Sequence, residues 1–309
     1  MEEIWAQIPQ QLVNGLTLGS VYALIALGYS MVYGTLEMLN FAHGEVFMIG
    51  AFIGWGVLGA FMNGAAIIAS PVIIIILMIV VAMAGTSALG VGIEWFAYRP
   101  LRNAPRLAPL ISALSVSIFL QNLVVLTMGA RSKVYATQLL IPISWQITVG
   151  PATISFIRIL VISVSFALMI GLDNFIRHSK TGKAMRATAQ DREAASFMGI
   201  SVNRVISTTF LVGSALAGAG GVLVGMYYTQ IDFYMGFSAG MKAFTAAVLG
   251  GIGNIRGAML GGILLGLVES LGVAFISPVY KDVIAFSMLI ILLIFKPAGL
   301  LGEQVPVKV

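Results

Sequence analysis

The chain has 309 residues, of which 59% are hydrophobic and only 9% are charged, and its mean hydropathy is +1.00. This balance excludes an ordinary soluble domain and predicts an all-α, polytopic membrane protein. The absence of cysteine excludes disulfides and thiolate-bound metals, and two histidines with twelve acidic residues leave little material for any other metal or cofactor site.

Apolar runs long enough to cross a bilayer occur about nine times along the chain. The seventh run is the weakest, because it holds only about 15 residues and ends in a cluster of glycines, which is typical of a half-helix or a re-entrant segment. No shift in composition marks a second domain, so residues 1–309 are predicted to form a single transmembrane domain. The nine runs are 12–33, 38–62, 67–95, 108–128, 157–176, 205–229, 240–254, 257–277 and 283–301.

The net charge of +5 lies in the connecting segments, where it needs no nucleic-acid partner and instead sets the orientation. Three arginines near residue 100 and the basic stretch 177–204 predict two cytoplasmic segments. The loop 129–156 between them is then expected outside, where its prolines and β-prone residues could form a small cap or hairpin. Counting from these anchors places the amino terminus outside, retained as a mature end, and the carboxyl tail inside. Arg131, Lys133 and Glu37 do not fit this scheme.

Two parts of the chain show the same pattern on either side of its middle. Residues 15–55 pass from a Gly-rich span through tyrosines and a polar break to a second Gly-marked span, and residues 213–254 repeat that order. The two copies enter the membrane in opposite senses, which is typical of inverted-topology repeats. Four crossings at each end would then pair around the single crossing 157–176.

The basic stretch 177–204 is predicted to be helical. Ser179 or Thr181 could cap a first helix, Asp191 a second, and Gly199 could end the second in the left-handed conformation. Its charges and modest apolar face suit either a solvated connecting loop or a helix pair that lies in a groove on a partner protein.

No motif for chemistry is present in the sequence, so no catalytic, cofactor-binding or metal-binding residue is predicted. The segment around Lys183 lacks the first glycine and the final Ser/Thr of an ATP-binding loop. Polar groups at membrane depth are the remaining candidates, since they face a cavity or another helix. Those chosen for a translocation path are Asn40, His43, Glu45, Lys242 and Thr245, with interhelical hydrogen bonding as the alternative for each.

Several longer motifs then point to one family. NGLTLGSVYALIALGY (14–29), LNFAHGEVFMIG (39–50), EWFAYRPLR (94–102), SIFLQN (117–122) and GMKAFTAAVLGGIGNIRGA (240–258) closely resemble permeases of high-affinity branched-chain amino-acid ABC importers. The chain looks like the first of the two permease subunits. This resemblance covers nearly the whole chain.

The resemblance implies a multi-pass protein of the bacterial inner membrane with an inverted-repeat permease fold. Its implied partners are a second permease subunit, two ATP-binding subunits and a periplasmic substrate-binding protein. It also assigns the coupling segment that docks on the ATPase to residues 182–201, with the Glu-Ala-Ala…Gly signature at Glu193. The residues expected to couple are Gly182, Arg186, Asp191, Arg192, Glu193, Ala194 and Gly199.

The favoured function is therefore alternating-access import of hydrophobic amino acids, driven by ATPase subunits that move residues 182–200. The permease itself is expected not to be an enzyme. One alternative is a permease of the same class for urea or short amides. Another is an ion-coupled secondary transporter that uses His43, Glu45 or Glu269 as a relay. Whether the second permease is a distinct chain or another copy stays open.

Overall fold

A computed structural model describes residues 2–62, 70–102, 104–105 and 107–302. Helices dominate the described chain, and eight of them are long and apolar enough to cross a membrane, so the protein is an all-α, multi-pass membrane protein. The helices of the eight long spans and one shorter helix, α9, are α1 (Glu2–Leu36), α2 (His43–Ala60), α3 (Pro71–Ile93), α4 (Leu107–Met128), α5 (Phe156–His178), α8 (Val202–Tyr228), α9 (Met235–Gly250), α10 (Ile255–Phe275) and α11 (Lys281–Phe295).

The nine predicted crossings correspond to these nine helices, with shifted ends. α9 holds 16 residues and is not among the eight long spans, as its glycine-rich end predicted. The second crossing starts later than expected, at His43, because residues 37–42 leave the helical path. α1 reaches further in both directions than the predicted 12–33. Residues 67–69 of the third predicted run lie outside the described residues.

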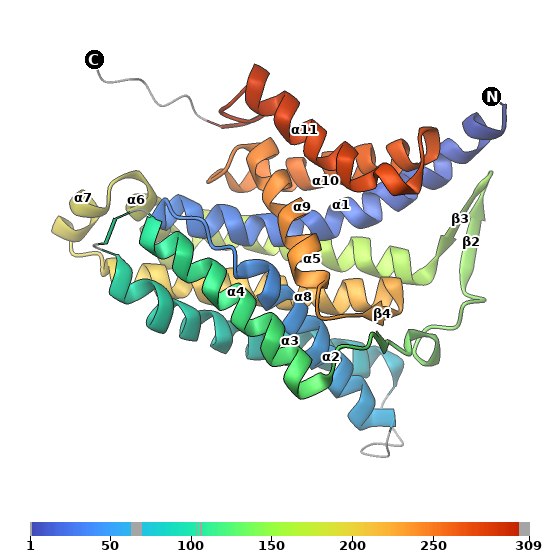
Figure 1. Cartoon of the computed structure of the whole chain (residues 1–309), viewed down its shortest axis with the longest axis horizontal. Helices are drawn as coiled ribbons and strands as arrows, with labels where there is room; N and C mark the ends of the chain where they lie inside the picture. The colour runs from blue at the N-terminus through green and yellow to red at the C-terminus, as the bar shows by residue number, and fades with distance from the viewer. Residues whose placement is uncertain (1, 63–69, 103, 106, 303–309) are drawn as a thin grey trace.

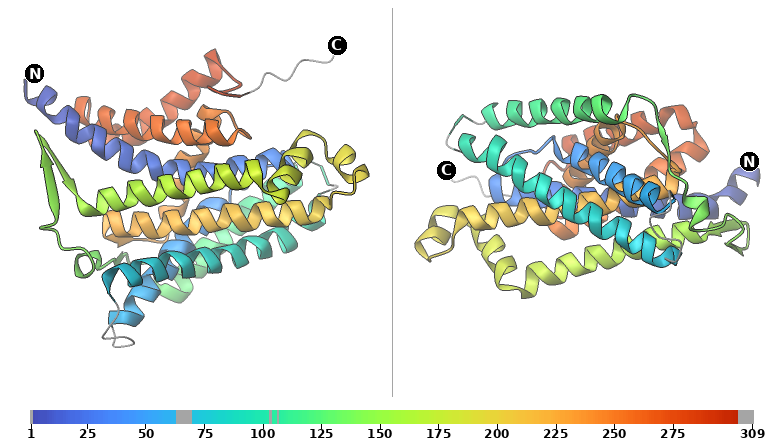
Figure 2. Two further views of the ribbon diagram at one scale, coloured as in Figure 1. Left: turned by 180° about the vertical axis from the view of Figure 1, so that it is seen from behind. Right: turned by 90° about the horizontal axis from the view of Figure 1, so that it is seen from below.

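Most of the helices run lengthwise through the bundle, and α9 crosses them (Figure 1). α1 packs along α10, and α8 lies against both α2 and α3 (Figure 2). If α1 is matched with α8, and α3 with α10, the α1–α10 contact corresponds to the α8–α3 contact. If α2 is matched with α9, the α2–α8 contact corresponds in the same way to the α9–α1 contact. The packing thus follows the order expected for inverted repeats.

Glycines let the paired helices approach closely. A methyl group at Gly19 of α1 would lie 2.8 Å from the Cα atom of Ile263 in α10. Gly50 of α2 likewise meets the backbone of Gly218 in α8. These small residues therefore serve helix contacts within the chain, which is how helices gain dispersion energy where lipid removes the hydrophobic driving force.

One end of the bundle, here named the hairpin end, carries the loop that follows α4. Two antiparallel strands, β2 (Gln146–Val149) and β3 (Ala152–Ser155), form the expected hairpin. A shorter pair joins β1 (Lys133–Val134) of this loop to β4 (Gln230–Ile231), between α8 and α9. The loop is thereby fixed to both halves of the chain. Figure 1 shows the hairpin beside the start of α1.

The opposite end, here named the basic end, carries two short helices, α6 (Lys180–Gln190) and α7 (Arg192–Phe197). Ser179 caps α6, since its Oγ accepts from the backbone NH of Gly182 at 2.8 Å. Asp191 Oδ1 caps α7 by accepting from Ala194 N at 2.9 Å. Gly199 has a φ of +82°, the predicted left-handed end. The first and last residues of the predicted stretch 177–204 belong instead to α5 and α8.

Candidate functional site

A cavity of about 410 Å³ opens towards the hairpin end, between α1, α2, α8, α9 and the start of α11. One side is apolar: Leu18, Val21 and Ile25 lie at helical spacing on α1, and Phe47 of α2 adds an aromatic face. The other side is polar and includes Lys242 of α9. A small cavity that combines an apolar wall with polar groups on the opposite side can hold a small organic molecule.

Lys242 is the centre of a buried ion cluster at this cavity. Its Nζ lies 2.7 Å from Glu269 Oε1 of α10 and 2.8 Å from Asp282 Oδ1 of α11. The side chains of Lys242 and Glu269 are each 5% exposed, whereas that of Asp282 is 52% exposed. The Tyr22 hydroxyl of α1 lies 3.5 Å from Glu269 Oε1. Sequence reasoning selected Lys242 and Glu269 separately, but nothing in their 27-residue separation reveals that they pair.

The other predicted path residues lie in buried contacts between helices. Glu45 Oε1 accepts hydrogen bonds from Ser117 Oγ at 3.1 Å and from Gln121 Nε2 at 2.7 Å, both on α4. The Tyr98 hydroxyl donates to Asn40 Oδ1 at 3.0 Å. Of the five path candidates, only Lys242 lines the cavity at the hairpin end.

His43 lies where α2 crosses α9, and Thr245 is buried further along α9. The buried ring of His43 faces Gly28 of α1, and its centroid is 5.0 Å from that of Tyr29. Thr245 donates to Met241 O of its own helix at 3.0 Å. The crossing itself is formed by Gly44 against Gly236 and Gly240. The polar break at 40–45 is thus brought next to the half-helix.

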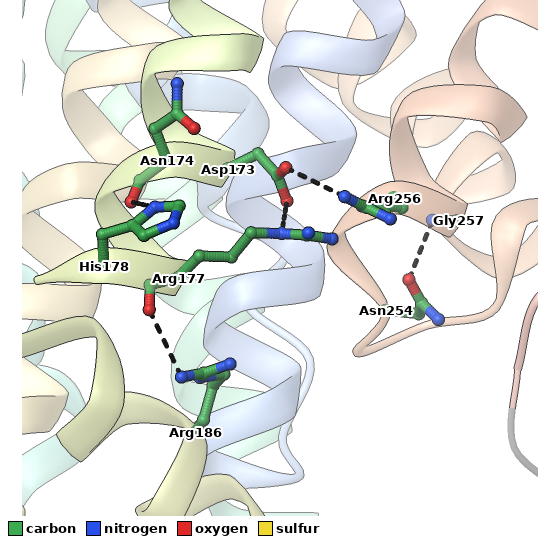
Figure 3. A network of polar contacts seen from close by, with 8 residues as sticks. All are labelled: Asp173, Asn174, Arg177, His178, Arg186, Asn254, Arg256 and Gly257. Atoms are coloured by element: carbon green, nitrogen blue, oxygen red, sulfur yellow. Dashed lines mark hydrogen bonds and ion pairs between the residues drawn. The ribbon is translucent and has the colours of Figure 1, made fainter.

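A second cavity, of about 790 Å³, opens at the basic end. The Asp173 carboxylate of α5 forms ion pairs with Arg177 Nε at 3.0 Å and with Arg256 Nη2 of α10 at 3.4 Å (Figure 3). Arg186 of α6 donates to the carbonyl oxygen of Arg177 at 3.4 Å. The basic segment is therefore joined through α5 to the second half of the bundle.

The coupling residues expected from the sequence divide into two groups. Gly182 and Arg192 face the bundle: Gly182 packs on the backbone of Ile176, and Arg192 Nε donates to Thr35 O at 2.8 Å. Arg186, Asp191, Glu193, Ala194 and Gly199 are exposed. The exposed group also contains two large apolar side chains outside the expected set, Phe197 at 80% and Met198 at 83% exposure.

Sequence reasoning missed one buried polar cluster near the basic end. Glu94 starts a π-helical turn, Glu94–Tyr98, that continues α3. Its carboxylate pairs with Arg102 and accepts from Ser207 Oγ of α8 at 2.7 Å. The available sequence signal was an acid within an apolar run followed eight residues later by an arginine, because a charged group at membrane depth needs a partner. The π-turn at this position is a further sign, since such turns often mark functional positions.

Comparison with known proteins gives a consistent result. Residues 11–293 match the family model described as "Branched-chain amino acid transport system / permease component". The chain is 47% identical to the high-affinity branched-chain amino acid transport system permease protein LivH of Escherichia coli, over 100% of both chains. It is 48% identical, again over 100% of both, to the corresponding permease protein BraD of Pseudomonas aeruginosa.

A weaker likeness extends to a second kind of permease. The probable branched-chain amino acid transport permease protein LivM of Methanocaldococcus jannaschii is 24% identical over 47% of this chain and 46% of its own length.

Proposed function

We propose that this chain is the membrane-spanning permease subunit of an ABC importer for branched-chain amino acids. The chain belongs to the family of branched-chain amino acid transport system permease components, and the proposal proceeds from that membership. The observation that carries the proposal is full-length similarity at 47% and 48% identity to two permeases named for that transport system. Neither urea uptake nor ion-coupled transport receives comparable support.

As a permease subunit the protein is not itself an enzyme. ATP hydrolysis belongs to separate ATP-binding subunits, because the chain lacks a phosphate-cradling loop. In this proposal the helices act as one permease domain, and residues 177–204 form the coupling segment within it. The exposed pair Phe197 and Met198 supports docking of a protein there, because bulky apolar side chains on a water-facing loop gain free energy when a partner covers them.

The remaining partners are a second permease and a periplasmic substrate-binding protein. The likeness to LivM supports a second permease of related sequence. The basic end then faces the cytoplasm of a bacterial cell, and the hairpin end, including loop 129–156 and the amino terminus, faces the periplasm. Arg99, Arg102 and the basic segment agree with that orientation, since Lys and Arg are retained on the cytoplasmic side.

Alternating access would use the two cavities at opposite ends of the bundle. Substrate released by the binding protein enters at the hairpin end, and motion of the coupling segment opens the basic end. The α2–α9 crossing lies between the two cavities, and its glycine contacts let these two short helices shift against each other.

Uptake of radiolabelled leucine and urea by proteoliposomes containing the permease with its cognate subunits tests the proposed substrate. The lumen is loaded with ATP, and the cognate binding protein is supplied outside with either solute. We expect ATP-dependent accumulation of leucine, isoleucine and valine but not of urea. Accumulation of urea in preference to leucine would assign the permease to the alternative class.

A further inference from the structure

We propose that the cavity at the hairpin end is a binding site for the amino acid itself, in which Lys242 binds the α-carboxylate and Asp282 is the group that this carboxylate displaces. This inference rests on the proposed function and adds where within one permease chain the substrate is held. The ligand class is an α-amino acid with an uncharged aliphatic side chain.

The two carboxylates that now hold Lys242 differ in what it costs to remove them. An ammonium group with 5% exposure must keep anionic partners, because an unpaired buried charge is strongly unfavourable. Glu269 is as buried as Lys242, so separating these two side chains would leave two unpaired charges out of contact with water. Asp282 is 52% exposed and can return to water. A substrate carboxylate arriving at the cavity can therefore take its place on Lys242 with no change in the number of ion pairs.

The rest of the cavity suits the other parts of an amino acid. Leu18, Val21, Ile25 and Phe47 form an apolar wall for an aliphatic side chain. Asp232 lies on the same lining and offers an acceptor for the α-ammonium group. The volume of about 410 Å³ falls within the range of roughly 300–1,000 Å³ found for small-molecule sites.

Binding in this manner would also change a contact between helices. Asp282 lies in the first turn of α11, and its ion pair joins that helix to α9. Displacing Asp282 from Lys242 releases the start of α11 while Glu269 keeps α9 attached to α10. A ligand shifts a conformational equilibrium through such a differential contact, so occupancy of the cavity is coupled to the position of the start of α11.

Competition binding tests which end of the amino acid is recognised. The purified complex of permease and ATPase subunits, without nucleotide or binding protein, is equilibrated with radiolabelled leucine. Two leucine analogues then compete: 4-methylpentanoate, which keeps the carboxylate, and 3-methylbutylamine, which keeps the ammonium. We expect the acid to compete at least ten times more effectively than the amine. Equal or better competition by the amine, or no competition by either, overturns the proposal.

Variants test the residues directly in the same assay. Asp282→Asn keeps the buried Lys242–Glu269 pair and removes the internal competitor. Because Asp282 is half-exposed, its pair with Lys242 is expected to contribute no more than about 1 kcal/mol, so leucine should bind about two to five times more tightly. Lys242→Met should abolish retention of leucine. Lys133→Met, at the hairpin end but outside the cavity, is the matched control and should bind as the unmodified complex does. Unchanged or weaker binding by Asp282→Asn contradicts the proposal even if Lys242→Met fails to fold.

Proteoliposome uptake separates this inference from the proposed function. If the complex takes up leucine in an ATP-dependent manner but 4-methylpentanoate does not compete for leucine binding, the permease function is supported and the proposed cavity site is wrong. Absence of leucine uptake with every partner subunit present removes both.

Discussion

Arg192 Nε donates a hydrogen bond to the carbonyl oxygen of Thr35 at 2.8 Å, so the basic segment is attached to the last turn of α1. Carbonyl groups in a last helical turn lack partners within the helix and favour a nearby cation. α1 runs from this point along α10 to the hairpin end. Arg192 therefore gives α7 a direct mechanical connection to the transmembrane bundle.

We expect Arg192→Ala to reduce leucine uptake while ATP hydrolysis and binding of the ATPase subunits persist. A hydrogen bond to a charged group contributes about 1.5–3 kcal/mol, so the coupled step should slow by roughly tenfold or more. Parallel assays of uptake and phosphate release in proteoliposomes check this. Lys183→Ala, an exposed position on α6, is the control and should behave as the unmodified protein. Equal leucine uptake by both variants would mean that the Arg192–Thr35 hydrogen bond does not contribute to the coupling of ATP hydrolysis to uptake.

Phe197 and Met198 are expected to contact an ATPase subunit. Replacing both with serine should weaken retention of ATPase subunits by about tenfold or more, because buried apolar anchors at interfaces are worth about 2 kcal/mol. Co-purification at graded concentrations measures the change. Gln190→Ser alters another exposed position of the segment without removing an apolar anchor, and should have little effect. Full retention by the double variant would place the docking contact elsewhere.

Local signals predicted most of the fold, because they depend on residues close in sequence. The caps at Ser179 and Asp191, the half-helix ending at Gly250 and the polar break near residues 40–45 all follow from near neighbours, whereas the later start of α2 at His43 was not expected. The inverted order of the spans was also visible as a pattern. Helix ends were less accurate, since α1 continues beyond its apolar run.

The side-chain partners could not be predicted in the same way. Lys242, Glu269 and Asp282 lie on three different helices, and only packing brings them into one ion cluster. Arg192 belonged to an expected docking surface, yet it faces Thr35, because a net basic loop does not reveal which arginines point inwards. Such relationships depend on tertiary contacts between distant segments.

Gly44→Ala should destabilise the α2–α9 crossing. A methyl group there would meet Gly236 and would lie 3.0 Å from the Cα atom of Gly240, so backbone must move. Overpacking of this kind costs about 1–3 kcal/mol. Thermal unfolding of the purified complex, followed by size-exclusion chromatography, measures the change. Gly56→Ala on the same helix has open space around its methyl group and should unfold as the original does. Equal stability of the two variants would argue against a tight crossing.

Glu269→Ala should lower thermal stability more than loss of Asp173, an acid that is only partly buried. It leaves buried Lys242 with only the half-exposed Asp282, and breaking a buried pair costs about 3–5 kcal/mol. Asp173→Ala removes pairs with exposed arginines and should cost no more than about 1 kcal/mol. Comparison of the two unfolding temperatures checks the prediction. A larger loss for Asp173→Ala would show that the Lys242 cluster does not stabilise the bundle.

The source of energy for leucine uptake distinguishes an ABC permease from an ion-coupled transporter. Proteoliposomes containing the complete complex, with leucine-loaded binding protein outside, are compared with and without ATP in the lumen, each in the presence and absence of a protonophore. An ABC permease predicts accumulation that requires ATP and is unaffected by the protonophore. Accumulation without ATP that collapses on adding the protonophore would contradict it.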